Sequence, residues 1–166
     1  MKNRRRGAAL VEAALFLPIL LALLIGTEEL ARVTYNYYMI QRVLSGLALT
    51  LGTQQGVNFC SAGSDPIIQA AINNALTGTV DGSGDPIVNG LTPSMVQVVG
   101  ATVSAATQQV SPCGCQPDCD PTQGGAPPGF IVVSLASGYT VHPLFWGFSV
   151  DPFPLQPSVT APYAGT

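Results

Sequence analysis

Four cysteines are the residues of this sequence whose chemistry is most informative. They are Cys60, Cys113, Cys115 and Cys119, the last three in the stretch CGCQPDC. Four thiols can form two disulfides or, as thiolates, hold a metal ion. The spacing is not the CxxC…CxxC pattern of zinc sites, so it favours disulfides in an oxidising compartment. A Cys113–Cys115 bridge would close a small strained ring, and we therefore expect Cys60 to pair with Cys113 or Cys115.

Other groups with possible chemistry lack the partners that catalysis or metal binding requires. His142 is the single histidine, and no recognisable motif places a serine or cysteine nucleophile beside it. The stretch DGSGD, residues 81–85, begins like a calcium loop. However, Pro86 and Thr92 stand where that loop needs a glycine and a glutamate. We expect no catalytic residue, no bound metal and no cofactor.

Charge is distributed very unevenly along the 166 residues. All 6 basic residues lie at or before Arg42, whereas the rest of the chain carries only aspartates. A segment without Lys or Arg cannot displace the counterions of a nucleic-acid backbone. The composition therefore excludes nucleic-acid binding by the region after Arg42.

An apolar run from Ala8 to Gly26 contains one charged residue, Glu12. About 20 apolar residues in a helix cross a bilayer, and Pro18 is tolerated in such a helix. The basic residues before the run predict a cytoplasmic N-terminus and place the cysteines outside the membrane. A cleaved secretory signal is the alternative, but the following TEELARV lacks a small-residue cleavage pattern.

After Gly26 the sequence predicts that the helix continues with an amphipathic pattern. Apolar residues recur at alternating spacings of three and four, and Gly52 and Gly56 are expected to end the helix. From Ala8 to its end, such a helix is about 65 Å long. The seam fits packing on the chain's own domain, packing against other subunits, or both. Its residues are Leu30, Val33, Tyr37, Ile40, Leu44, Leu47 and Leu51.

The N-terminal stretch RRRGAALVEAALFLPILLALLIGTEELAR resembles TadE-like minor pseudopilins of the tight-adherence (Tad/Flp) pilus, in the type IV pilin-like superfamily. These proteins begin with a basic leader, a glycine and a glutamate five positions later. An apolar stretch with an early proline and a G-x-x-E…R element follow. The matching positions in this chain are Gly7, Glu12, Pro18, Gly26, Glu29 and Arg32.

The resemblance implies cleavage between Gly7 and Ala8 by a prepilin peptidase, which creates a new α-amine on Ala8. It also implies that the chain sits in the bacterial inner membrane with its C-terminal module in the periplasm. The expected partners are other pilin subunits and the inner-membrane assembly platform. A charge at the centre of a membrane costs about 2.5–3.5 kcal/mol, and less near an interface, whereas the helix dipole stabilises an acid in the first turn by only about 0.3–1 kcal/mol. We therefore expect Glu12 to pair with the amine of a neighbouring subunit.

The remainder of the chain predicts a small module with a short helix and an antiparallel sheet. Asp65 is expected to cap a helix over residues 65–76, with Pro66 in its first turn. Strands enriched in β-branched residues are predicted over 95–105, 130–142 and 157–163, and the prolines place the last one at an edge. The predicted fold class is α+β and pilin-like.

The sequence thus divides into four expected regions. They are a basic leader (1–7), a transmembrane helix (8–26), its amphipathic continuation (27–55) and a disulfide-stapled α+β module (56–166).

The leading functional hypothesis is a structural, non-enzymatic minor pilin subunit that assembles through helix bundling. The alternative is an anchored or secreted disulfide-rich binding module that contacts a partner or surface through an aromatic loop. Core packing is the other role open to that loop. Its aromatic residues are Phe145, Trp146, Phe148 and Phe153.

Overall fold

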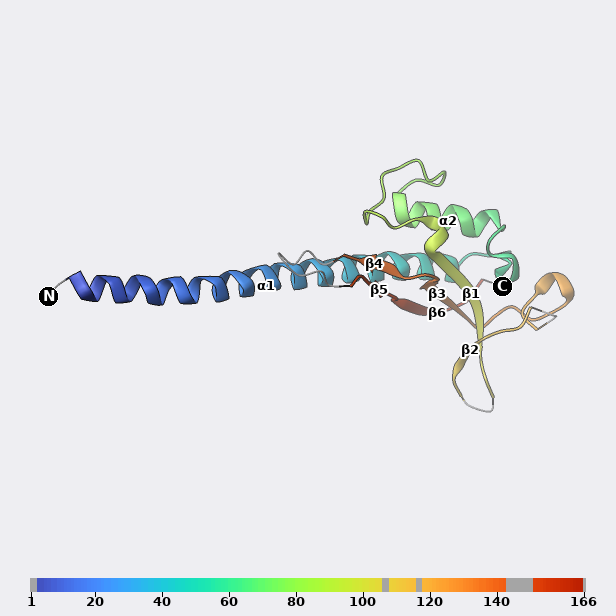
Figure 1. The fold of residues 1–166 in the computed structure, drawn as a ribbon. Helices are drawn as coiled ribbons and strands as arrows, with labels where there is room; N and C mark the ends of the chain where they lie inside the picture. The colour runs from blue at the N-terminus through green and yellow to red at the C-terminus, as the bar shows by residue number, and fades with distance from the viewer. Residues whose placement is uncertain (1–2, 106–107, 116–117, 143–150, 166) are drawn as a thin grey trace. The chain divides into compact units, whose positions relative to one another are not determined.

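The structure, a computed structural model, describes residues 3–105, 108–115, 118–142 and 151–165 (Figure 1). The chain divides into two compact units. The first contains Met1–Tyr35 and Val141–Phe153, and the second contains Asn36–Thr140 and Pro154–Thr166. The secondary structure is a long apolar helix, a shorter helix and antiparallel strands, which confirms the predicted α+β class.

The first helix, α1, spans Asn3–Gly52 and continues through Pro18. It ends at Gly52, as the sequence predicts. The end is held by the C-terminal segment of the chain, because the Ala164 N–H donates a 2.8 Å hydrogen bond to the Gly52 carbonyl. A Cβ on Gly52 would lie 2.8 Å from the Pro162 carbonyl oxygen, so the absence of a side chain permits this close approach.

The second helix, α2, spans Pro66–Thr77 and has the predicted N-cap. One oxygen of Asp65 accepts hydrogen bonds from the N–H groups of Ile67 and Ile68, at 2.8 and 3.3 Å. These bonds satisfy two donors that lack partners inside the helix. Pro66 occupies the first turn, where a missing N–H costs nothing. At the other end, Gly78 adopts a left-handed conformation and closes the helix.

A four-stranded antiparallel sheet has the strand order β2-β1-β3-β6. Its strands are β1 (Val96–Val103), β2 (Val110–Pro112), β3 (Phe130–Leu135) and β6 (Ser158–Pro162). The register pairs Val98 with Val133 and Ile131 with Ala161. Alternate residues of β3 are buried, as expected for a sheet with one face on the core. The proline-containing β6 lies at an edge, as predicted, because proline cannot donate to a ladder.

The single strand predicted over 130–142 is wrong: it is divided into β3 and β4 (Tyr139–Val141). Gly138 lies between them with φ +72°, and a Cβ there would lie 2.8 Å from the Cβ of Pro154. The chain therefore turns at Gly138, and β4 pairs with β5 (Phe153–Leu155) in a separate two-stranded sheet. The short strands β2 and β5 were not predicted from the sequence.

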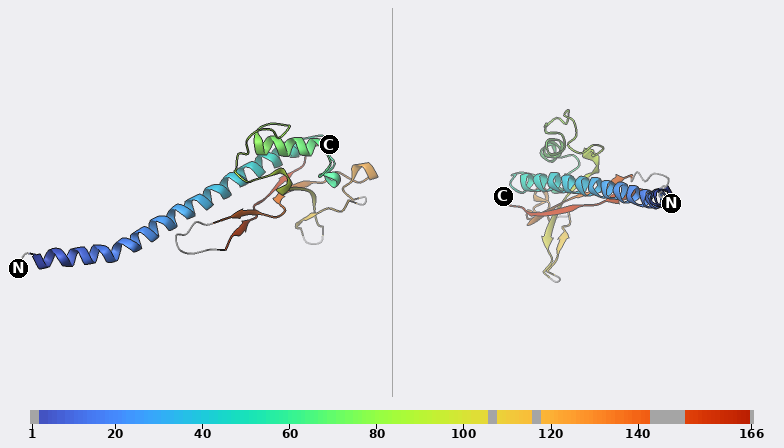
Figure 2. Two further views of the ribbon diagram at one scale, coloured as in Figure 1. Left: turned by 45° about the horizontal axis from the view of Figure 1, so that its top comes forward. Right: turned by 90° about the vertical axis from the view of Figure 1, so that its left-hand side faces the viewer.

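The core of the second unit joins both helices to the four-stranded sheet. The C-terminal part of α1 lies between α2 and the strands (Figures 1 and 2). One continuous apolar cluster contains buried residues of all three layers. From α1 come Ile40, Leu44, Leu47 and Leu51, from α2 come Ile68, Ile72 and Leu76, and from the sheet come Val98, Ile131, Val133 and Leu135.

Candidate functional site

The N-terminal half of α1 exposes nearly all of its described apolar side chains. Leu15 and Leu24 are 68% and 63% exposed, and the intervening large residues are comparable. By its length and composition, α1 can cross a membrane. Exposed apolar area of this extent is costly in water.

The predicted processing site and two of the predicted assembly residues lie in this half of α1. The backbone of Gly7 is already helical, and so is that of Ala8. Glu12 is exposed among apolar neighbours, and so is Pro18. The Glu12 side chain is therefore exposed on the surface of α1.

Glu29 and Arg32, two further positions of the N-terminal pattern, lie about one helical turn apart on α1. Arg32 Nη1 lies 4.0 Å from Glu29 Oε1, with side-chain exposures of 57% for Arg32 and 12% for Glu29. The second oxygen of Glu29, Oε2, is buried and has no hydrogen-bond partner among the described residues. A largely buried carboxylate with one long ion pair is incompletely compensated, so Glu29 retains capacity for another donor.

The apolar seam of α1 has two different environments. Ile40, Leu44, Leu47 and Leu51 are buried in the core of the second unit. Leu30 remains 67% exposed and Tyr37 39% exposed, and Val33 is half-buried. The C-terminal residues of the seam thus pack on the chain's own domain, whereas Leu30 and Tyr37 are accessible for contacts with other subunits.

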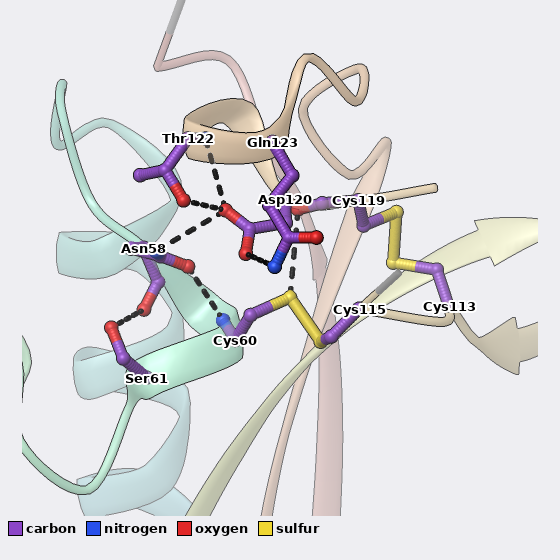
Figure 3. Close-up of a disulfide and its surroundings, with 9 residues drawn as sticks. All are labelled: Asn58, Cys60, Ser61, Cys113, Cys115, Cys119, Asp120, Thr122 and Gln123. Atoms are coloured by element: carbon purple, nitrogen blue, oxygen red, sulfur yellow. Dashed lines mark hydrogen bonds between the residues drawn. A yellow bond between two sulfur atoms is a disulfide. The ribbon is translucent and has the colours of Figure 1, made fainter. Parts of the chain in front are cut away.

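Two disulfides cross-link the second unit, which confirms the prediction of disulfides. Cys60 pairs with Cys115, one of the two alternatives left open by the sequence, and Cys113 pairs with Cys119 (Figure 3). The first bridge joins residues 55 positions apart, whereas the second closes a loop of six positions. The Cys60–Cys115 bridge therefore connects the turn before α2 to the loop after β2.

A buried carboxylate, Asp120, organises the loop beside these disulfides (Figure 3). Its Oδ1 accepts hydrogen bonds from the Thr122 hydroxyl and N–H at 2.6 and 2.9 Å, and from Asn58 Nδ2 at 3.4 Å. Gln123 Nε2 donates to Oδ2 at 3.1 Å. Asn58 in turn accepts from the Cys60 N–H. This network joins the two disulfide-bearing segments, and sequence reasoning missed it although Asp-Pro-Thr is a typical capping pattern.

These hydrogen bonds favour the ionised form of Asp120. The Thr122 hydroxyl is the largest influence that lowers the pKa of Asp120 from its ordinary value, with smaller contributions from the Thr122 N–H, Gln123 and Asn58. Burial opposes this shift in the pKa. Because the folded-state pKa is depressed, the stabilisation is present above the unfolded value, about 3.9, and is lost as pH falls through the folded value.

We expect Asp120→Asn to lower stability near pH 6 and to flatten its dependence on pH. An amide cannot accept hydrogen bonds at both terminal atoms, so the bond from Gln123 or those from Thr122 must be lost. Urea unfolding of the purified full chain between pH 3 and pH 6 measures both effects. Asp118→Asn, which removes an exposed carboxylate of the same loop, is the control. Identical pH profiles for Asp120→Asn and the unchanged protein would contradict the role of this network.

A pocket of ≈ 370 Å³ lies beside the network. Val57, Pro121, Pro127 and Tyr163 supply apolar surface, and Asn58 and Thr122 supply polar groups. None of the described residues that line this pocket is charged. Over the described ranges, no group of three or more His, Cys, Asp or Glu side chains is arranged to hold a metal ion.

The aromatic loop falls mostly beyond the part of the chain that the structure describes. Phe145, Trp146 and Phe148 lie outside the described residues. Phe153 begins β5 and is 39% exposed, and His142, which follows β4, is also exposed.

The N-terminal helix matches a known protein family. Residues 7–48 match the family described as TadE-like protein. The matched segment begins at Gly7 and includes Glu12, Pro18, Glu29 and Arg32, all within α1. No curated protein and no solved structure matches the chain.

Proposed function

We propose that this chain is a structural, non-enzymatic minor pilin subunit of a Tad-type pilus, because residues 7–48 match the TadE-like family. The observation that carries this proposal is the coincidence of the family match with a helix that exposes its apolar side chains. Such a helix serves first as a membrane anchor and then as the bundling element of an assembly. The disulfide-bonded second unit is the part carried outside the membrane.

Processing at Gly7 prepares the helix for assembly in this proposal. A prepilin peptidase, acting from the cytoplasmic side of the inner membrane, cleaves between Gly7 and Ala8. Glycine suits this position because its backbone, free of a Cβ, can extend into a protease cleft. Cleavage removes the four basic residues before Gly7 and exposes a cationic amine at Ala8.

Glu12 then supplies the complementary charge. The amine of one subunit and the Glu12 carboxylate of its neighbour attract each other strongly in a medium of low dielectric constant. Their pairing offsets the cost of placing each charge among apolar residues. The pair also aligns neighbouring helices, which draws the subunit into a bundle with other pilin subunits above the assembly platform.

The mature N-terminus tests this proposal directly. We expect intact-mass and N-terminal sequence analysis of the protein from native membranes to give a chain that starts at Ala8. Gly7→Val should leave the chain at full length, because a branched side chain obstructs extension of the backbone in the protease cleft. Ala14→Val is the matched control, since it places the same branched side chain further along α1 and should not affect cleavage.

Other starting residues would support other functions. A chain that retains Met1 would indicate a simple membrane anchor, and a start near Thr27 would indicate a secreted protein. Either result would contradict the pilin proposal and favour the binding module as the function.

A further inference from the structure

The two disulfides of the second unit are interleaved along the chain. In sequence order, the first cysteine is bonded to the third and the second to the fourth, as Cys60–Cys115 and Cys113–Cys119. Four cysteines allow three pairings. A pairing that contains a Cys113–Cys115 bridge closes a small strained ring, so the native pairing has one competitor. That competitor joins consecutive cysteines, as Cys60–Cys113 and Cys115–Cys119.

The unfolded chain does not favour the native pairing over this competitor. Cys113 and Cys115 are two positions apart, so the loops that they close with Cys60 differ little in length. The entropy of closing a loop changes only with the logarithm of its length. Along the chain, Cys119 is nearer to Cys115 than to Cys113, which makes the non-native bridge at least as easy to close. Oxidation before folding therefore gives a mixture of both pairings.

Contacts of the folded unit select the native pairing. Cys119 is 3% exposed, and its N–H donates a 2.9 Å hydrogen bond to the Gly114 carbonyl. The next residue, Asp120, accepts a hydrogen bond from Asn58, which belongs to the segment of Cys60 (Figure 3). The Cys60 Sγ lies 3.7 Å from the Cys119 carbonyl oxygen. The native bridges fit this arrangement, which exists only once the unit has folded.

A mispaired chain cannot correct itself, because either pairing consumes all four cysteines. Exchange of disulfides requires a thiolate that attacks a disulfide sulfur, and a fully oxidised chain contains no thiol. The sequence also does little to stabilise a thiolate in this loop. No Lys or Arg follows Arg42, and aspartates lie on both sides of Cys119. The attacking thiolate must therefore come from another molecule.

We propose that this chain is a substrate of a thiol–disulfide isomerase in the oxidising compartment, and that pairing of Cys60 with Cys115 depends on it. The partner is defined by its chemistry, a nucleophilic thiolate that is kept reduced at an accessible site. The inference goes beyond the proposed function, because it concerns how the second unit reaches its native pairing and does not depend on cleavage at Gly7.

The exchange proceeds in three steps with no net oxidation, and each step breaks one S–S bond and forms one. The isomerase thiolate attacks the Cys113 sulfur of the Cys60–Cys113 bridge, which forms a mixed disulfide and releases Cys60 as a thiolate. The Cys60 thiolate attacks the Cys115 sulfur, which forms the first native bond and releases Cys119 as a thiolate. The Cys119 thiolate attacks Cys113 in the mixed disulfide, which forms the second native bond and regenerates the isomerase thiolate.

Refolding of the full chain in detergent tests this dependence. The reduced, denatured chain is oxidised rapidly, transferred to refolding buffer without free thiol, and incubated with or without reduced protein disulfide isomerase. Tandem mass spectrometry of the linked peptides distinguishes the two pairings, because backbone breakage at Gly114 separates Cys113 from Cys115. Without isomerase, we expect about half of the chains to stay mispaired. The isomerase should accelerate their conversion to the native pairing at least about tenfold.

Two controls separate disulfide exchange from general assistance with folding. Isomerase whose active-site cysteines have been alkylated should have no effect, because it cannot supply the thiolate. The double variant Cys113→Ala, Cys119→Ala retains one possible bridge and should form it without isomerase. Complete native pairing of the unchanged chain without isomerase would overturn the proposal, and so would a failure of active isomerase to convert the mispaired chain. Equal dependence of the double variant, or an equal effect of the alkylated isomerase, would also overturn it.

Discussion

Replacing Glu12 with alanine is expected to abolish incorporation of the subunit into pilus assemblies while leaving it in the membrane. The substitution makes α1 more apolar, so insertion into the membrane should be maintained or improved. Assembly should fall at least about tenfold, because the amine of the neighbouring subunit loses its counter-charge in a medium of low dielectric constant. Recovery of the subunit in sheared pilus or assembly-platform fractions, relative to total membrane protein, measures the effect.

Two further variants show whether the charge is responsible. Glu12→Gln keeps the size of the side chain but removes the charge, and it should reproduce the loss. Leu15→Ala shortens a 68% exposed apolar side chain one turn away and should have a much smaller effect. Normal assembly of Glu12→Ala would show that Glu12 serves only the helix N-terminus, where it contributes about 0.3–1 kcal/mol.

Removal of the Cys60–Cys115 disulfide should produce the largest loss of stability in the second unit. The bridge joins residues 55 positions apart. Because it restricts the unfolded chain, its removal is expected to lower the free energy of unfolding by about 4 kcal/mol. That is a large share of the total of about 5–15 kcal/mol for a domain. Replacement of both cysteines by alanine avoids a free thiol. Urea unfolding of the detergent-purified chain provides the measurement.

The Cys113–Cys119 disulfide is the matched comparison within the same loop. Its cysteines are only six positions apart. Replacing both with alanine should therefore lower the free energy of unfolding by a smaller amount, about 2 kcal/mol. Equal losses for the two double variants would contradict the entropic argument. They would indicate instead that native contacts of the loop, including those of Asp120, dominate its stability.

Apolar spacing and capping patterns, which involve only nearby residues, were sufficient to predict the helices and their ends. The uniform apolar run and the spacing from Leu30 to Leu51 predicted one long helix, and Gly52 ends it. Asp65 and Pro66 predicted the start of α2, because capping depends only on residues within one turn. The same reasoning failed over residues 130–142. Continuous β-type residues hid the turn at Gly138, whose close neighbour Pro154 is distant in the sequence.

Charge and apolar patterning were enough to predict that α1 is a long apolar helix and to show that the later module lacks basic residues, and the residues around Gly7 and Glu12 were enough to show a resemblance to TadE-like proteins. These features depend on neighbouring residues, so they can be recognised without the fold. The folded chain was needed to show that Cys60 pairs with Cys115 and that Asp120 collects donors from Asn58 and Thr122. Each of these arrangements brings together different elements of the chain, and their proximity is produced by packing of the whole module.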